Sequence, residues 1–369
     1  MRPAATATSR GGGEYGSLAG MRALTVEPGR AGSLAVTEVA EPVPGDGELL
    51  VEGLALGVCG TDKEIAHGEY GAAPPGRDRL VVGHESLGRV RTAPGGSGFA
   101  VGDLVVGVVR RPDPVPCGAC AHGEFDMCRN GRYTERGIKE LDGYGSERWS
   151  VPPDYAVALA PELERVGVLL EPASVVAKAW EQVQRVGERA WFEPARVLVT
   201  GAGSIGLLAA LLGVRRGLDV HVLDRVSAGP KPGLVTSLGA TYHSEPAGEV
   251  AARLRPDVVI EATGAGQVVI DTIGHTAPYG IVCLTGVSAA GRRIGVDAGG
   301  LNRELVLEND AVLGSVNANL RHYRQAADAL AGADPAWLDA MITRRVPLDR
   351  ATEAFTATDD DVKVVITLG

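Results

Sequence analysis

A glycine-rich turn, Gly201-Ala-Gly203-Ser204-Ile205-Gly206, limits the possible folds of this chain more than any other feature. The segment Arg196–Thr200 before it is apolar and β-branched, and the segment LLAALLGV after it suits a buried helix. In such a strand-turn-helix the first glycine permits a tight turn and the second lets a pyrophosphate approach the backbone. The third lets helix and strand pack closely. The pattern predicts a dinucleotide-binding unit.

Glycine-rich turns also occur in α/β proteins that bind no nucleotide, so the neighbouring residues decide the interpretation. Asp224 ends the next predicted strand, eighteen residues after Gly206, where a carboxylate can accept hydrogen bonds from an adenosine ribose. Because such a carboxylate repels a 2′-phosphate, NAD is the favoured cofactor. Arg225 and Lys231 follow directly, and these cations leave NADP open as a second cofactor.

The rest of the chain divides into two kinds of pattern. Solid apolar segments alternate with helical ones past residue 194, which predicts a parallel sheet covered on both faces. Residues 21–151 instead contain short β-like segments broken by Gly and Pro, and a helical stretch follows near residues 168–186. We expect a flexible tail (1–20), a first domain (21–187), a nucleotide domain (188–317) and a return to the first domain (318–369).

Composition excludes several classes of function. A chain of 369 residues exceeds the roughly 250–300 residues that one core supports, which favours two domains. With 36 basic and 46 acidic side chains the net charge is −10, which argues against nucleic acid or a membrane surface as partner. Without a signal-like apolar segment, an odd set of five cysteines favours metal over disulfides and predicts a cytoplasmic protein.

Two short motifs at predicted strand ends carry zinc-type ligands. Cys59 lies in GVCGTD and His84 in GHE, and thiolate and imidazole are ligands that zinc prefers. Either residue alone would more often be an ordinary core residue. Glu171, in an otherwise apolar stretch, would cost several kcal/mol if buried without a partner, and a nearby cation would remove that cost.

These motifs, with the EP pair before a helix, the downstream cysteines and the GAGSIG turn, resemble the zinc-dependent medium-chain alcohol dehydrogenases over nearly all of residues 21–369. The stretches CGTDKEIAHGEY, LVVGHESLGRV, RYTERGIKELDGYGSE and LLEPASVVAKAW are most similar to the glucose 1-dehydrogenase branch. The resemblance implies a two-domain α/β fold, in which a Gly-rich, β-barrel-like (GroES-like) catalytic domain accompanies a Rossmann doubly wound parallel sheet.

The resemblance also implies roles for individual residues. Cys59 and His84 would ligate a catalytic zinc, with Glu85 and Glu171 ligating directly or through water, and Asp62 would orient the His84 ring. The remaining implied roles are a bond from Thr61 to the reacting oxygen, proton transfer to solvent by Glu64, contacts of Glu135, Glu171 and Asn317 with substrate hydroxyls, and cofactor contacts from Gly201, Gly203, Ser204, Ile205, Gly206, Asp224, Arg225 and Asn317.

The second cysteine cluster departs from the family's four-cysteine structural zinc lobe. Cys117, Cys120 and Cys128 match three of the four positions, and Pro114 stands at the other. Since zinc accepts oxygen ligands, Asp113 is the candidate for the fourth position, with His122 or water as substitutes. An occupied site and an empty remnant both remain open.

Together these features predict hydride transfer between a nicotinamide cofactor and a hydroxyl carbon of a sugar, polyol or cyclitol. Val175 and Leu307 stand where some sugar-oxidising relatives carry polar residues, so a less oxygenated secondary alcohol or ketone is the alternative. A zinc-free reductase and a nucleotide-sensing protein of the same fold are the rival classes. The segments after residue 279 resemble the sheet edge through which relatives associate, which predicts a homodimer or homotetramer.

Overall fold

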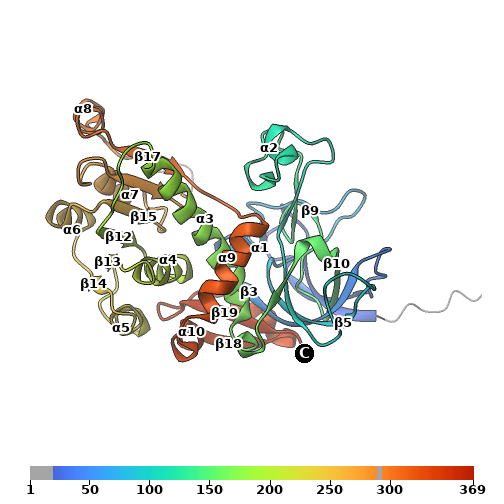
Figure 1. Cartoon of the computed structure of the whole chain (residues 1–369). Coiled ribbons are helices and arrows are strands. Elements are labelled where there is room, and N and C mark those ends of the chain that lie inside the picture. Colours follow the sequence, from blue (N-terminus) through green and yellow to red (C-terminus); the bar gives the residue numbers. More distant parts are fainter. Residues whose placement is uncertain (1–19, 289–292) are drawn as a thin grey trace, which may run out of the picture.

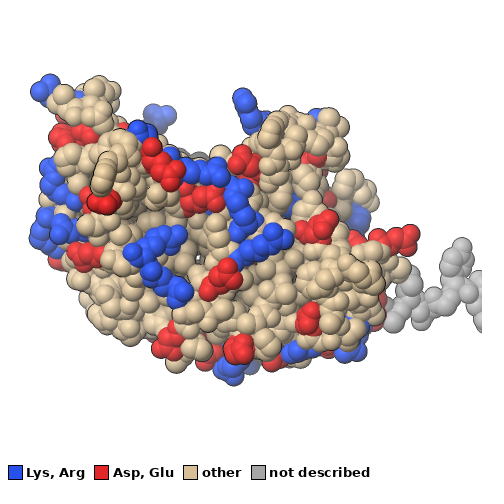
Figure 2. Space-filling model, in the orientation of Figure 1, with Lys and Arg blue, Asp and Glu red and all other residues tan. Residues whose placement is uncertain are grey.

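A computed structural model describes residues 20–288 and 293–369, so the predicted tail lies outside the described residues except for Gly20. The chain forms two parts side by side, a helix-covered sheet and a β-rich part, with two long helices between them (Figure 1). Lys and Arg side chains are interspersed with Asp and Glu over the face that Figure 2 shows. Within the described residues, none of the helices combines the length and apolarity needed to cross a membrane.

The helix-covered sheet has six parallel strands in the order β14-β13-β12-β15-β16-β17. The strand order reverses between β12 and β15, which is where a ligand crevice opens at the carboxyl ends of such a sheet. The Rossmann-type parallel sheet predicted from the sequence is confirmed, although the sequence patterns missed the short strand β14. The strands are β12 (Arg196–Thr200), β13 (Asp219–Leu223), β14 (Thr241–His243), β15 (Val258–Glu261), β16 (Ile281–Leu284) and β17 (Ala311–Gly314).

Helices connect these strands and cover the sheet. The apolar helix after the glycine-rich turn is buried along most of its length, because it packs between the sheet and other helices. Its burial explains why its sequence is apolar on every side rather than amphipathic. The helices are α4 (Ser204–Val214), α5 (Pro230–Ser237), α6 (Ala247–Leu254), α7 (Gly266–Ile273) and α8 (Ala298–Glu308).

The β-rich part is built on a seven-stranded sheet that includes the end of the chain. Its order is β11-β6-β5-β3-β19-β18, with β10 also pairing with β3. The terminal strand β19 is antiparallel to β3, so Val365 lies opposite Gly57. This sheet contains β3 (Leu49–Val58), β5 (Glu85–Thr92), β6 (Leu104–Gly107), β10 (Arg148–Val151), β11 (Ala156–Leu159), β18 (Ile342–Pro347) and β19 (Lys363–Thr367).

Two smaller sheets and several short helices complete the β-rich part. One sheet has the order β2-β1-β4 and the other β7-β8-β9. Their strands are β1 (Gly20–Val26), β2 (Ala35–Ala40), β4 (Leu80–Val81), β7 (Arg110–Arg111), β8 (Thr134–Arg136) and β9 (Glu140–Leu141). The helices are α1 (Gly60–Ala66), α2 (Gly118–Ala121) and the 3-10 turns η1 (Phe125–Met127), η2 (Pro153–Tyr155), η3 (Pro161–Leu163), η4 (Gly167–Leu169) and η5 (Leu348–Phe355).

Helix α3 (Leu170–Gly187) joins the two parts and packs on both α4 and α9 (Leu320–Ala331) (Figure 1). Its buried Trp180 donates to the Ala209 carbonyl of α4 at 3.3 Å. Glu171 lies in the first turn of this helix. The same rigid element therefore positions a candidate metal ligand and contacts the helix that follows the nucleotide turn. After α9, the short helix α10 (Pro335–Met341) leads into β18.

Candidate active site

The first group of site residues lies where β3 ends and α1 begins. Cys59 is the N-cap residue of α1, and its backbone N–H donates to Asp62 Oδ2 at 2.9 Å. The other oxygen, Asp62 Oδ1, lies 3.3 Å from His84 Nδ1. The buried Asp62 carboxylate therefore fixes the turn that carries Cys59 and also lies against the ring of His84, and its orienting role stays a prediction.

His84 reaches this group because two glycines, Gly83 and Gly137, allow the backbone beside it to pack closely. Gly83 has a φ of +96°, and a Cβ there would lie 2.4 Å from Leu56 Cδ2. Gly137, at the turn after β8, packs so closely on Gly83 that a Cβ would lie 2.5 Å from the Gly83 carbonyl oxygen. The result places His84 Nε2 3.2 Å from Cys59 Sγ and brings the end of β8 beside the same loop.

Two carboxylates approach His84 from other elements. Ligand atoms of His84, Glu85 and Glu171 all lie within 4.8 Å of one another, and the three residues are buried. They are not equivalent, because Lys363 Nζ on β19 donates to Glu85 Oε1 and Oε2 at 2.7 and 2.6 Å. Glu171 has no hydrogen bond or ion pair from its carboxylate to a described residue.

The pKa shifts of Cys59, Glu171 and His84 indicate that this group lacks a compensating cation. Burial raises the pKa of the Cys59 thiol, and the Asp62 charge adds to this effect. Burial also raises the pKa of Glu171 to about 7. For His84, burial acts to lower the pKa, but Asp62 and Cys59 outweigh it and hold the pKa well above its ordinary value. In the absence of a cation, these pKa shifts favour the protonated forms of Cys59, His84 and Glu171, which offsets the negative charge of the group.

The donor set fits zinc. Thiolate, imidazole and carboxylate are common zinc ligands. His84 lies in one group with Cys59 and Asp62 and in a second group with Glu85 and Glu171, so it links all three ligand types. Lys363 already neutralises Glu85, which leaves Glu171 as the buried carboxylate that lacks a cation. A divalent ion would stabilise the thiolate and carboxylate forms that burial disfavours.

Two residues with predicted proton roles lie on α1 beside this group. Thr61 is half-buried in its first turn, and its hydroxyl makes no hydrogen bond to any residue in the described ranges. Glu64 lies one turn along the helix and is half-buried as well. Helical spacing puts i and i+3 side chains on one face, so Thr61 and Glu64 share a face of α1, and their proton roles stay a prediction.

The glycine-rich turn has the geometry that a pyrophosphate requires. Gly201 has a φ of +90°, and a Cβ on Gly206 would lie 1.7 Å from the Gly201 carbonyl oxygen. Around Gly203, in contrast, no atom lies within 4 Å of the Cβ position among the described residues. Gly203 is the N-cap of α4, so Ser204 and Ile205 present the first backbone N–H groups of the helix to this open space.

Asp224 faces the turn that it follows. Its Oδ2 accepts from Ala202 N at 2.7 Å and from Lys231 Nζ at 3.2 Å, and its Oδ1 accepts from Val226 N at 3.3 Å. Burial acts to raise the Asp224 pKa, but these donors outweigh it and lower the pKa. A neighbouring cavity of about 480 Å³ is lined by residues 225–229, Asp359 and Asp360. Arg225 is therefore part of its wall.

Two predicted substrate contacts, Glu135 and Asn317, meet each other. Glu135 Oε1 accepts from Asn317 Nδ2 at 2.7 Å and from Arg110 Nε and Nη2 at 3.1 and 2.9 Å. No described donor reaches Glu135 Oε2. Asn317 adopts a left-handed backbone conformation, with a φ of +62°, in the segment between β17 and α9.

The second cysteine group forms without its expected fourth ligand. The Sγ atoms of Cys117, Cys120 and Cys128 lie within 4.8 Å of one another. Hydrogen bonds from the backbone N–H groups of Arg129 and Cys120 lower the pKa of Cys117 to about 6, which favours a thiolate.

Asp113 and His122 do not join this cysteine group. Asp113 accepts from Val115 N and from Asn130 Nδ2, at 2.8 and 2.9 Å. His122 Nδ1 instead contacts the Gly118 carbonyl oxygen at 2.7 Å. The Asp113 carboxylate therefore closes its own loop and lies outside the group of three Sγ atoms, and its role as a zinc ligand stays a prediction.

Sequence reasoning missed four buried charged residues around these sites: Lys363, Arg110, Asp126 and Lys178. Two of them carried a usable signal, since lysine in the apolar segments VKVVITL and VVAKAW is costly to bury without a partner. One interpretation also changes, because Leu307 lies on α8 and is 61% exposed. It therefore gives no information on pocket polarity.

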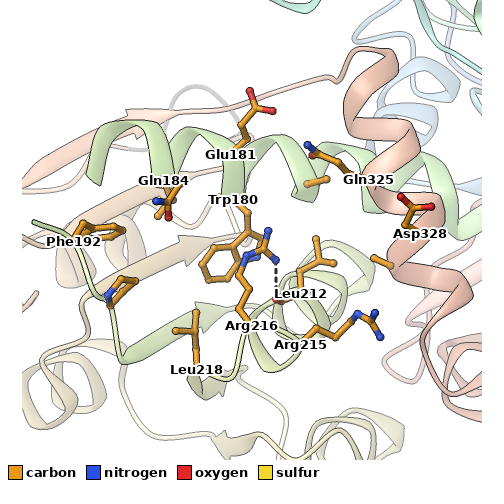
Figure 3. Close-up of a pocket in the computed structure, with 14 residues that line it drawn as sticks. Trp180, Glu181, Gln184, Phe192, Leu212, Arg215, Arg216, Leu218, Gln325 and Asp328 are labelled. Carbon is orange, nitrogen blue, oxygen red and sulfur yellow. Dashed lines mark hydrogen bonds between the residues drawn. The ribbon is translucent and has the colours of Figure 1, made fainter. Parts of the chain in front are cut away.

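A separate cavity of about 630 Å³ lies between α3, α4 and α9 (Figure 3). Trp180 and Phe192 form part of its apolar wall, and the Arg216 guanidinium contacts the Trp180 ring face. Arg216 also donates to the Leu212 carbonyl at the end of α4. None of the predicted site residues lines this cavity.

Comparison with known protein families places the whole chain. Residues 45–162 match the family model described as alcohol dehydrogenase GroES-like domain, and residues 164–368 match glucose dehydrogenase C-terminus. The chain is 40% identical over 358 residues to a glucose 1-dehydrogenase of Methanocella arvoryzae, covering 95% of this chain and 100% of the relative. It is 41% identical over 357 residues to that of Thermoproteus tenax, covering 94% and 99%.

Solved structures give the same result. The glucose dehydrogenase of Haloferax mediterranei in complex with NADP, Zn and gluconolactone superimposes with a TM-score of 0.87 at 34% identity. The match covers 95% of this chain and 99% of that one. A structure named as a putative zinc-binding dehydrogenase from Sinorhizobium meliloti bound to NADP superimposes with a TM-score of 0.80 at 28% identity. The match covers 95% of this chain and 99% of that one.

Proposed function

Since the chain belongs to the glucose dehydrogenase-like branch of the zinc-dependent medium-chain alcohol dehydrogenases, we propose that it oxidises a pyranose sugar at its anomeric carbon. The broader activity is that of a zinc-dependent NAD(P) sugar dehydrogenase. The anomeric position is supported by the glucose 1-dehydrogenase relatives and by the lactone bound to the Haloferax enzyme. The observation that carries the proposal is that buried His84 lies close to the Cys59 thiol and also to the Glu85 and Glu171 carboxylates.

The residues around His84 would have different roles in the reaction. Cys59, His84 and Glu171 would hold zinc, which when bound supplies the Lewis acidity that makes a sugar hydroxyl acidic near neutral pH. Asp62, 3.3 Å from His84 Nδ1, would keep His84 Nε2 turned toward Cys59. Lys363 keeps Glu85 close to the site but neutralised.

The proton released from the sugar hydroxyl needs a path. The free hydroxyl of Thr61 would hydrogen-bond to the reacting oxygen and pass the proton on, and Glu64 on the same face of α1 would accept it near the surface. A bound nicotinamide ring would accept the hydride from the carbon that carries this hydroxyl. Gly201, Gly203 and Gly206 would position that ring by holding the pyrophosphate at the start of α4.

Recognition of a sugar rests on polar groups that lack protein partners. Glu135 Oε2 is available to accept from a substrate hydroxyl while Oε1 is held by Arg110 and Asn317. A pocket with such groups disfavours a less oxygenated alcohol, because the carboxylate would lose water without gaining a partner. This favours a sugar over the alternative substrate.

We further propose that NAD is preferred and NADP is accepted. Asp224 is close to the expected ribose position, Lys231 offsets its charge, and Arg225 lines the neighbouring cavity.

The deciding experiment is a substrate screen with zinc-loaded protein, NAD and NADP, over aldoses, cyclitols and simple secondary alcohols. We expect reduction of the nucleotide with an aldose and trapping of the lactone by hydroxylamine. Faster turnover of a simple alcohol than of any aldose would overturn the proposal.

The free edge of the parallel sheet supports a proposal about assembly. In the described part of the chain β17 pairs with β16 alone, and exposed Val306, Leu307 and Val312 lie on or beside it. We propose that two copies associate through this edge, as unpaired strands invite pairing.

A further inference from the structure

We propose that Asp126, in the cysteine lobe, is a positioning residue for the sugar-binding carboxylate Glu135. We define the cysteine lobe as residues 113–132, which carry Cys117, Cys120 and Cys128. Asp126 would act through two buried cations, Lys178 and Arg110. This inference rests on the proposed function, since it concerns how the sugar is held.

The first link joins the lobe to helix α3. Lys178 Nζ lies 2.8 Å from Asp126 Oδ2, and both side chains are at most 1% exposed. The same ammonium group donates to the Val316 carbonyl at 2.9 Å. Burial of two charges is costly, so the pair persists only because each charge also has other polar partners. Lys178 therefore ties the backbone directly before Asn317 to the lobe.

The second link passes through Arg110 on β7. Its Nη1 donates to the Asp126 carbonyl oxygen at 2.8 Å, while Nε and Nη2 donate to Glu135 Oε1. The planar guanidinium holds these partners at fixed angles, which a lysine could not do. Tyr133 supports it from one face, with its ring centroid 3.7 Å from Arg110 Cζ. The orientation of Glu135 thus depends on where Asp126 lies.

The third link closes the network at the start of α9. Asn319 caps this helix and donates from Nδ2 to Asp126 Oδ1 at 2.8 Å. Val316 and Asn319 are thus both anchored to the Lys178–Asp126 pair, and Asn317 lies between them in its left-handed conformation. Anchoring on both sides directs Asn317 Nδ2 to Glu135 Oε1.

This network determines which oxygen of Glu135 is open to a ligand. Three donors hold Glu135 Oε1, which fixes the carboxylate plane and leaves Oε2 for a ligand. A sugar hydroxyl that donates to Oε2 would then gain a charge-assisted hydrogen bond without first ordering the acceptor. Asp126 contributes to this bond without touching the substrate.

The test uses a double variant, Asp126→Asn with Lys178→Met, because removing one charge alone would leave the other buried and unpaired. Steady-state kinetics are measured with the preferred aldose and with its monodeoxy analogues. Glu135→Gln identifies the analogue that lacks the hydroxyl bound by Glu135. For the double variant we expect the KM of the parent sugar to rise about tenfold, the worth of one such hydrogen bond. The KM of that analogue should change less than about twofold, and the Kd of NAD should be unchanged.

A second variant keeps the test decisive if the first fails to fold. Arg110→Lys retains the charge but loses the fork that joins Asp126 to Glu135, and we expect the same selective loss. The control is Arg350→Gln with Glu353→Gln, an exposed pair on η5, which should leave all of these constants unchanged. Equal losses for the parent sugar and every analogue, or no loss in a folded variant, would overturn the inference alone. Absence of aldose turnover in the unmodified chain would overturn the proposed function as well.

Discussion

Side chains of the same type differ chemically in this protein because they have different contact partners. Cys59 and Cys283 are both free cysteines, but Cys59 contacts His84 whereas Cys283 is packed within the parallel sheet. Burial raises the pKa of Cys283 to about 12, so it remains a neutral thiol. Of these two cysteines, Cys59 has the neighbours needed to become a thiolate on metal binding.

This difference gives a matched pair of variants. Cys59→Ser should lower the zinc content and reduce kcat at least about 100-fold, because a metal ligand is lost. Cys283→Ala should bind zinc normally and lose only about 1–2 kcal/mol of stability from the small cavity. Metal analysis, kinetics and thermal unfolding measure the three quantities. Full turnover by zinc-depleted Cys59→Ser protein would contradict the assignment of Cys59.

His322 gives a residue-scale prediction about pH. Burial lowers its pKa to about 4, whereas an unfolded histidine titrates near 6.5. Between these values the unfolded chain binds more protons, so stability falls as the pH falls, with a slope of at most about 1.4 kcal/mol per pH unit from this residue. Below the folded pKa, no further loss comes from it.

The measurement is the free energy of unfolding from urea titrations between pH 7 and pH 4, for the unmodified chain and for His322→Gln. We expect a shallower pH dependence in the variant, because glutamine does not titrate. Identical slopes in the two proteins would show that His322 is not protonated on unfolding in this range.

The limits of sequence reasoning are also clearest at single residues. Glu171 was noticeable because a carboxylate is rare in apolar surroundings, whereas Cys59 and His84 were noticeable only because their motifs occur together. That Lys363 holds Glu85 could not be predicted from spacing, since 278 residues separate them and β19 must first pair with β3. The loop that the Asp113 carboxylate closes could not be predicted either, because proximity in sequence to the cysteines does not reveal this local hydrogen bonding.

At the scale of elements, the turn between β12 and α4 was the most predictable part of the fold. Gly201 and Gly206 meet local steric requirements and Gly203 leaves open space, so the pattern of glycines is directly readable from the sequence. The β-rich part was predictable only as a class. Its strand order depends on β18 and β19 returning from the end of the chain, and no local pattern encodes that pairing.

Two glycines of this turn should respond differently to the same change. In Gly206→Ala the new methyl group would meet the Gly201 carbonyl oxygen, so we expect a loss of about 2 kcal/mol or more in stability. In Gly203→Ala the methyl group meets no described atom and the backbone φ of −81° is ordinary, so stability should be retained.

The same Gly203→Ala variant should bind nucleotide at least about tenfold more weakly, because the methyl group fills the space that a pyrophosphate needs. Thermal unfolding and titration with NADH by fluorescence separate the two effects. Unchanged NADH affinity in Gly203→Ala would show that the pyrophosphate does not approach this glycine.

For the whole molecule, the exposed edge of β17 sets the proposed assembly. Ala311 N and Ser315 N donate to carbonyls at Gly280 and Leu284 on the β16 side, so the N–H groups of the alternate residues Val312 and Gly314 point to the free edge. Pairing of two such edges about a two-fold axis would join two six-stranded sheets and cover the apolar residues beside β17.

Val312→Lys should therefore weaken the dimer at least about tenfold, because antiparallel pairing near a two-fold axis brings the two introduced ammonium groups together. Val43→Lys is the control, since Val43 is also an exposed valine but lies on a loop of the β-rich part. Sedimentation velocity over a range of protein concentrations gives the dissociation constants. The dimer should persist in the control and dissociate in Val312→Lys, whereas equal dimerisation of the two variants would place the interface elsewhere.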